Sequence, residues 1–272
     1  MTLQRGGTVL AALDGGPSSP AILTVAGEVA HMMDGHVEAV YVAEPGTNPP
    51  RERARAAGVP LLEMRGEVLE VLLGQTSRAD VQATVIGARG TPSGPLPAGH
   101  VALALATAAE APVVLTPPVL NGHRGLRTLL VPLDGPSEAV GAISAAVDLA
   151  LDTHREVVFL HVHELHDLPL VTDQPQYESE AWGRAFLQRR FPRRDDVRLE
   201  VRVGRAADQL CTVASEIGAD MILLGWSQRL DAGRAVVVQA ALSSTALPVM
   251  LVPSRTSSGR VVPRTNTAVA TR

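Results

Sequence analysis

Two aspartates follow short apolar runs in the sequence, Asp14 after residues 9–13 and Asp134 after residues 129–133. Apolar runs of this length are typical of buried parallel strands, and such sheets bind ligands beyond the carboxyl ends of their strands. The stretch 87–99 is rich in glycine and lies between another apolar run and a helical pattern. Backbone N–H groups in such a loop, with the N-terminus of the next helix, can bind phosphate without a lysine. The spacing therefore indicates a phosphate site, and a plain strand-to-helix connection is the alternative.

All 24 basic residues are arginines, because the sequence contains no lysine. A Walker P-loop needs its lysine on the phosphates and a Schiff-base enzyme needs a lysine amine, so both classes are excluded. Segment 14–19 resembles the pyrophosphatase loop of ATP-dependent ligases, but Asp14 and Ser18 stand where that loop needs serine and aspartate. No Gly-x-Ser-x-Gly, His-Glu-x-x-His or Gly-x-Gly-x-x-Gly motif occurs. We therefore expect no catalytic residues and at most a weak ATPase activity.

The formal net charge is −4, and such a chain lacks the concentrated basic surface with which proteins bind nucleic acid. The lone cysteine, Cys211, cannot form an internal disulfide, which fits a reducing compartment, and we expect a small buried hydrophobe there and no nucleophile. The apolar runs are too short to span a bilayer, and the N-terminus has no signal-peptide pattern. We expect a cytoplasmic protein with neither a nucleic-acid nor a membrane partner.

Three histidines crowd one segment, His161, His163 and His166, with Glu164 and Asp167 beside them. His161 and His163 share a face of the predicted strand, and two histidines with a carboxylate could ligate zinc. The alternative is a buried His161, with the other two histidines in a solvent-facing loop. Because the segment has no Cys/His zinc signature, we expect no metal.

The chain is an internal repeat. Asp14 and Asp134 lie 120 residues apart within matching segments, whereas Gly87 and Gly225 lie 138 residues apart within matching segments. The second copy therefore carries 18 extra residues, which fall between positions 164 and 204. Two copies of one plan predict two similar domains.

Within each copy, apolar runs of about five to seven residues alternate with stretches of helical period, the pattern of a parallel sheet covered by helices. Strands are predicted at 7–13, 36–43, 59–64, 81–86 and 111–116, and at 127–133, 156–163, 197–202, 219–224 and 247–252. Helices are predicted at 17–34, 51–57, 66–79 and 99–109, and at 136–151, 175–191, 204–217 and 233–245, with the extra residues lengthening the helix around 177–190. We expect a first domain at 1–117, a linker at 118–126, a second domain at 127–253 and a disordered tail at 254–272.

Both copies resemble universal stress protein domains arranged in tandem. The resemblance covers nearly the whole chain apart from the tail, and it is carried by the segments 13–15, 41–44, 132–135, 160–164, 204–208 and 214–225. It implies an α/β fold of two doubly wound domains, each a five-stranded parallel sheet flanked by helices, similar to the adenine nucleotide alpha hydrolase architecture.

ATP-binding members of that family have an aspartate at the end of the first strand, a valine at the end of the second and a loop Gly-x2-Gly-x9-Gly-Ser/Thr. Carried over to the first copy, the resemblance implies that ATP contacts Asp14, Val42, Gly87, Gly90, Gly99 and His100. The copy departs from the pattern twice. Eight residues separate the last two glycines, and His100 stands where the hydroxyl should be. The imidazole could replace that hydroxyl only as a well-aimed cation; it could also cap the helix or block the pocket.

The second copy keeps Asp134, Val162 and Gly225, but Gln228 replaces the second loop glycine, and Ala235-Val236 stand where Gly-Ser/Thr should be. Side chains there obstruct the close backbone approach that phosphate needs. Trp226 could cover the crevice or pack on a neighbour, and we expect packing. ATP is therefore expected in the first copy or nowhere.

The resemblance implies a non-enzymatic regulatory or binding protein of the stress response. The alternatives are an ATP-binding protein with slow hydrolysis in the first domain and a structural interaction module without a ligand. Family resemblance also implies self-association through the final strands, here residues 113–116 and 249–252. These apolar edges would be covered by the partner domain of the same chain or by a second chain in a homodimer.

Overall fold

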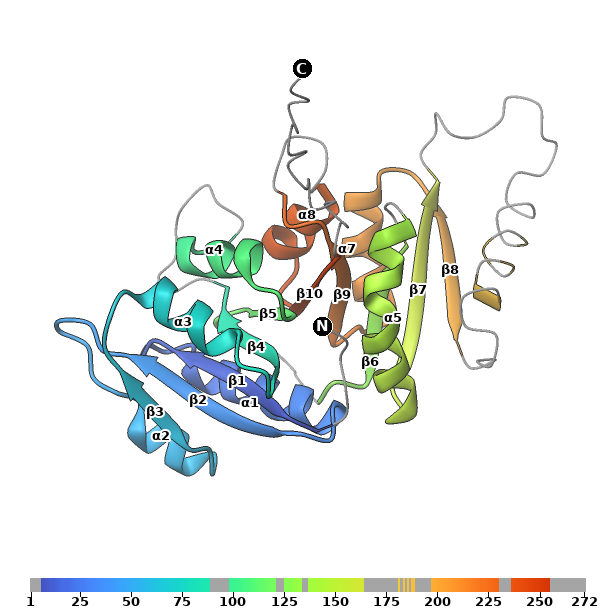
Figure 1. Cartoon of the computed structure of the whole chain (residues 1–272). Helices are drawn as coiled ribbons and strands as arrows, with labels where there is room; N and C mark the ends of the chain where they lie inside the picture. Colours follow the sequence, from blue (N-terminus) through green and yellow to red (C-terminus); the bar gives the residue numbers. More distant parts are fainter. Residues whose placement is uncertain are drawn as a thin grey trace, which may run out of the picture.

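The computed structural model describes residues 6–88, 98–120, 125–133, 137–163, 197–229 and 236–254, together with residues 181, 183, 185, 187 and 188. In this part of the chain, ten strands form one sheet in the order β3-β2-β1-β4-β5-β10-β9-β6-β7-β8. Helices cover both faces of the sheet (Figure 1). The predicted α/β class is therefore confirmed.

The first half supplies five parallel strands in the order β3-β2-β1-β4-β5. Its strands are β1 (Thr8–Leu13), β2 (His36–Val42), β3 (Leu61–Met64), β4 (Val81–Gly87) and β5 (Val113–Thr116). Its helices are α1 (Ser19–Met32), α2 (Arg51–Ala56), α3 (Val68–Thr76) and α4 (His100–Ala108). Each of these elements was predicted, with ends that differ by at most three residues.

The second half repeats the plan, with parallel strands in the order β8-β7-β6-β9-β10. Its strands are β6 (Thr128–Pro132), β7 (Glu156–His163), β8 (Arg198–Val203), β9 (Met221–Trp226) and β10 (Val249–Pro253). Its helices are α5 (Ser137–Asp152), α7 (Ala206–Glu216) and α8 (Val236–Ser244). The equal strand order confirms the internal repeat.

Some predictions fall on residues that the structure does not describe. Within the predicted helix 175–191, the described residues 181, 183, 185, 187 and 188 are helical, and the remainder lies outside the described residues. Part of the expected linker, 121–124, and residues 255–272 of the expected tail also lie outside them.

The two halves meet at β5 and β10, which pair antiparallel at the centre of the sheet. Two copies that present the same edge to each other pair in this way when a twofold rotation relates them. All four described residues of β5 are buried, so neither half leaves this apolar edge open to solvent. The expected association of the final strands is thus confirmed within one chain. The register joins Leu115 to Val249, Val114 to Met250 and Val113 to Leu251.

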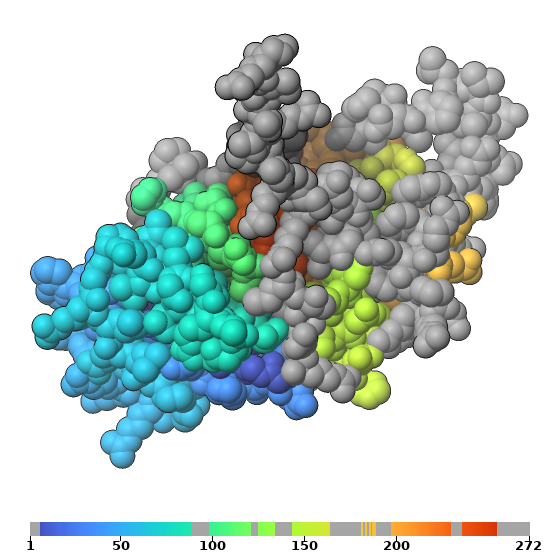
Figure 2. Space-filling model, viewed as in Figure 1, coloured from blue at the N-terminus to red at the C-terminus, as the bar shows by residue number. Residues whose placement is uncertain are grey.

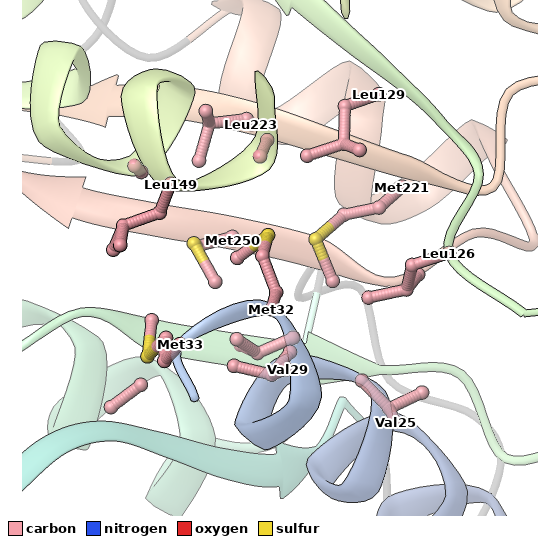
Figure 3. Packing of buried hydrophobic residues seen from close by; sticks show 14 of the residues in the cluster. Val25, Val29, Met32, Met33, Leu126, Leu129, Leu149, Met221, Leu223 and Met250 are labelled. Carbon is pink, nitrogen blue, oxygen red and sulfur yellow. The ribbon is translucent and has the colours of Figure 1, made fainter. Parts of the chain in front are cut away.

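The halves share their hydrophobic core on each face of the sheet. On one face, α1 of the first half and α5 of the second half contribute to a single buried cluster. Figure 3 shows Met32, the last residue of α1, facing Met221 and Met250 of the second-half strands. The flexible thioether side chains of methionine fill irregular gaps between packed elements. On the other face, a second cluster joins α3 and α4 to α7 and α8.

The length and hydropathy of the helices bear on whether the chain could span a membrane. Among the helices of the described ranges, none is long and apolar enough to cross a membrane.

Candidate functional site

A pocket of about 390 Å³ opens at the carboxyl ends of β1, β2 and β4 in the first half. Its volume lies within the range of small-molecule sites, about 300–1,000 Å³. Helices α3 and α4 form the opposite wall. The pocket is lined by Ala12, Leu13, Asp14, Ile22, Val42, Glu44, Val68, Leu72, Ile86, Gly87, Gly99, His100, Val101 and Ala102.

Asp14 lies at the mouth of this pocket, directly after β1, and its side chain is exposed. The backbone N–H of Gly16 donates to Asp14 Oδ1 at 2.7 Å, a local turn that holds the carboxylate in place. Gly15 has a φ of 75°, and a Cβ there would lie 2.5 Å from the Asn48 carbonyl oxygen, so this position requires glycine. Arg53 of α2 donates to the carbonyl oxygens of Gly15 and Gly16 at 2.7 and 2.9 Å. The loop that carries Asp14 is therefore fixed from two sides.

The walls of the pocket are aliphatic. Val42, Leu72 and Ile86 are at most 8% exposed, and they belong to the core on the α3–α4 face of the sheet. Two carboxylates, those of Asp14 and Glu44, are the polar groups at the strand ends. Such walls suit a flat apolar ligand that carries a hydrogen-bond donor toward the strand ends.

The N-terminus of α4 forms the other polar end of the pocket. Gly99 is the N-cap residue, with φ −63° and ψ 153°; no side chain caps the helix, and its first turn contains no acidic residue. The first backbone N–H groups of a helix have no partner within the helix, and the helix dipole adds partial positive charge there. The Gly99 N–H donates to the Ala88 carbonyl oxygen at 2.6 Å, which ties the helix start to the end of β4. The uncapped turn can bind an anion.

His100 occupies the first position of α4, and its side chain is exposed at the rim of the pocket. Gly99 is the N-cap residue, so His100 lies one position inside the helix. The three expectations for His100, a helix cap, a blocking ring and a phosphate donor, stay predictions.

The structure brings five of the six predicted site residues to one pocket, namely Asp14, Val42, Gly87, Gly99 and His100. Gly90 lies outside the described residues. That these residues bind a nucleotide stays a prediction.

Sequence reasoning missed the apolar lining, which includes Ile22, Val68, Leu72 and Val101. Val68 and Leu72 are four residues apart, a helical spacing that places both on one face of α3. That spacing is visible in the sequence, but it does not say whether the face meets the sheet, another helix or a ligand.

A buried hydroxyl close to the pocket was also missed. Ser18 is 1% exposed, and its Oγ has no hydrogen-bond partner among the described residues. The Oγ lies 3.5 Å from the position that a Cβ on Gly87 would take. A water molecule or a ligand atom beside the Gly87 backbone would satisfy it.

The corresponding region of the second half is built differently. Trp226 is 2% exposed, and its Nε1–H donates to the Ala106 carbonyl oxygen of α4 at 3.0 Å. The expectation that Trp226 packs on a neighbour is confirmed. Gln228 has a φ of 60°, and its Nε2 donates to the Ala109 carbonyl oxygen at 2.7 Å. Asp134 and Ala235 lie outside the described residues.

His161 and His163 lie on one face of β7, with their ring centroids 4.4 Å apart in an edge-to-face contact. Burial, and to a lesser degree the neighbouring His163, lowers the pKa of His161 to about 4. His163 belongs to the strand and is half-buried, so its expected position in a solvent-facing loop was wrong. Within the described ranges, no three His, Cys, Asp or Glu side chains lie close enough together to hold a metal ion. Glu164, His166 and Asp167 are outside those ranges.

Cys211 lies half-buried in α7. Burial raises the pKa of its thiol, which disfavours the reactive thiolate. The expected full burial of Cys211 is therefore wrong, and the expectation that it is no nucleophile stays a prediction.

Comparison with known proteins gives one family and several similar folds. Residues 125–253 match the model of the Universal stress protein family. A universal stress protein from Archaeoglobus fulgidus superposes with a TM-score of 0.67 at 16% identity, covering 91% of this chain and 98% of that chain. A protein of unknown function from Pseudomonas aeruginosa superposes with the same score at 14% identity, covering 91% and 92%. At these identities the likeness is one of fold. No curated protein matches the chain.

Proposed function

We propose that this chain, which contains a universal stress protein domain at residues 125–253, is a regulatory protein that binds an adenine nucleotide in its first half. Over both halves the chain has the fold of a solved universal stress protein. The binding site is the pocket between the strand ends of the first half and α4. The protein acts by binding, without a chemical step.

The observation that carries the proposal is the order of chemical groups along one pocket. Asp14 offers a carboxylate acceptor, as the exocyclic amine of adenine requires. The side chains of Val42 and Ile86 offer flat apolar contacts of the kind that a purine ring makes. The first turn of α4, which has no side-chain cap from Gly99, offers backbone N–H groups for phosphate oxygens. A nucleotide presents a donor, a flat ring and an anion in that same order.

The ionisable groups of the pocket support binding without catalysis. The described lining contains three of them, Asp14, Glu44 and His100, and no hydrogen bond in the described structure joins any two of the three. A general base and a nucleophile would have to be within hydrogen-bond reach of each other. We therefore propose that the bound nucleotide is a signal and not a substrate.

The proposal assigns no nucleotide to the second half. Trp226 at the end of β9 and Gln228 after it donate their side-chain N–H groups to the C-terminal end of α4, so this part of the chain serves the contact between the halves. A side chain at the position of Gln228 also prevents the close backbone approach that a loop glycine permits.

The test is calorimetric titration with ATP of the wild type, Asp14→Ala and the matched variant Asp134→Ala. Loss of the Asp14 acceptor should weaken binding about tenfold, equivalent to ~1.4 kcal/mol. The Asp134 variant, changed at the corresponding position of the repeat, should remain within about twofold of the wild type. Equal losses in both variants, or a wild type that binds no ATP, would overturn the proposal. Mass spectrometry of small molecules released from the purified protein gives an independent reading.

A further inference from the structure

The C-terminal end of α4 is held by side chains from the other half of the chain. Trp226 Nε1–H donates to the Ala106 carbonyl oxygen at 3.0 Å, and Gln228 Nε2 donates to the Ala109 carbonyl oxygen at 2.7 Å. The last carbonyl groups of a helix have no partner within the helix and need an outside donor. The last residue of β9 and the residues that follow it thus supply the cap of a helix about 120 residues away in sequence.

These hydrogen bonds lie in a closely packed region. Trp226 is 2% exposed, and Ala106 and Ala109 are each 3% exposed. A buried carbonyl group that loses its donor is strongly disfavoured, because water cannot replace the lost partner. In the space-filling view the surface of α4 adjoins that of the last described segment, which contains α8 and β10 (Figure 2). The position of α4 along its axis therefore depends on the second half.

The backbone of Gln228 points to the same role. Its φ of 60° is in the left-handed region, where glycine fits freely and a residue with a side chain is strained. A glycine would satisfy the turn but would supply no donor to α4. The strain at this residue is offset by the hydrogen bond that its amide makes across the halves.

The opposite end of the same helix forms the pocket. Gly99, His100, Val101 and Ala102 line it, while Ala106 lies one turn further along α4. A helix of nine residues spans about 13 Å and moves as one rigid unit, so a shift at one end is felt at the other. The second half is thereby connected to the N–H groups proposed to bind phosphate.

We propose that Trp226 and Gln228 are positioning residues for the first-half pocket, and that the second half serves as a built-in regulatory domain that sets ligand affinity through α4. This inference rests on the proposed binding function of the pocket. By reciprocity, a ligand in the pocket changes the environment of Trp226, which carries the signal into the second half.

The first test compares Gln228→Gly with the matched control Ser227→Gly. Ser227 is the exposed neighbour in the same segment, and it makes no hydrogen bond to α4. Gln228→Gly removes the donor and relieves the strained backbone, so its urea midpoint should remain near that of the wild type. ATP titrated into this variant should bind about fivefold more weakly or worse, whereas the control should match the wild type. Equal ATP affinities of Gln228→Gly and the wild type would overturn the proposal.

Hydrogen exchange of the ligand-free protein separates this inference from the proposed function. Amides of α4, including those in its first turns, should exchange faster in Gln228→Gly than in Ser227→Gly. If α4 loosens while the wild type binds no ATP, the proposed nucleotide site fails and the positioning of α4 by the second half stands. Unchanged exchange along α4 would contradict the positioning role.

A spectroscopic signature tests the reverse direction. The chain contains 2 tryptophans, so Trp182→Phe leaves Trp226 as the sole indole. Adding ATP to this variant should change the Trp226 emission, and Asp14→Ala in the same background should abolish the change. If calorimetry shows that ATP binds to Trp182→Phe but the Trp226 emission does not change, α4 does not transmit the signal.

Discussion

Ala88, directly after β4, and Trp226, at the end of β9, occupy equivalent places in the two halves, yet they have different tasks. In the first half, the Ala88 carbonyl oxygen accepts the N–H of Gly99 at the start of α4, beside the pocket. In the second half, Trp226 stands at the position equivalent to Ala88 and donates to the end of that same helix. These two residues therefore contact α4 at its two ends, although only the end of β4 lines the pocket.

This difference teaches how a duplicated domain can diverge without a change of fold. Strands β4 and β9 lie one strand away from the β5–β10 joint, so their last residues lie near the opposite half. Ala88 has a small side chain, whereas the Trp226 side chain reaches across the joint to Ala106. The same strand end thus borders a pocket in the first half and makes a contact between the halves in the second.

The largest effect should come from Trp226→Ala. Truncating a buried tryptophan leaves a cavity and removes the donor to Ala106, so we expect a loss of about 3–5 kcal/mol in the free energy of unfolding. The equivalent change in the first half, Ala88→Gly, should cost at most about 1 kcal/mol. Urea denaturation measures both values. Similar losses of unfolding free energy in the two variants would contradict the idea that Ala88 and Trp226 have different tasks.

An intermediate effect is expected from His161→Tyr, which gives the second half the residue found at the equivalent Tyr41. Folding lowers the pKa of His161 to about 4, so the unfolded chain binds a proton that the folded chain does not. The contribution of the neutral His161 ring to the free energy of unfolding is complete above pH ~6.5 and is lost as the pH falls toward 4. For this half-exposed ring we expect about 1 kcal/mol between pH 7 and pH 5.

The measurement is the free energy of unfolding of wild type and variant at both pH values. His161→Tyr should lose this part of the pH dependence, and His161→Gln serves as a second variant in case tyrosine overfills the site. The same pH dependence in wild type and both variants would show that another group carries it.

The smallest effect is expected from His100→Ser, which places the family hydroxyl at the start of α4. A serine is smaller than the imidazole and its hydroxyl can donate to phosphate, so ATP should bind about two- to fivefold more tightly, below ~1.4 kcal/mol. The matched change at the start of α8, Val236→Ser, should leave ATP binding unchanged, because that helix borders no proposed site. Weaker binding after His100→Ser would show that the histidine itself contacts the ligand.

The sequence alone determined the elements, their order and the likeness of the two halves. Apolar runs and helical periods placed each described strand and helix, because a parallel strand must be buried on both faces and a covering helix must bury one. Ends shifted by a few residues: the strand predicted at 59–64 begins at Leu61, and the helix predicted at 17–34 is α1. Pattern changes do not locate the last hydrogen bond of an element.

The site was predicted in part. Asp14, Val42 and Gly87 stand at strand ends, and parallel strands bring their carboxyl ends to one edge of the sheet, so their proximity followed from the sequence. The α3 wall of the pocket did not follow, because the same helical spacing would fit contact with any apolar surface.

Only the tertiary structure decided what Trp226 and Gln228 do. Their partners, Ala106 and Ala109, are about 120 residues away, and a backbone carbonyl has no signature in the sequence. The family resemblance could say that Gln228 is not the expected glycine, but not that its amide caps α4. Which donor reaches which carbonyl is fixed by packing across the β5–β10 joint, since hydrogen bonds form only where folding brings a donor within about 3 Å of an acceptor.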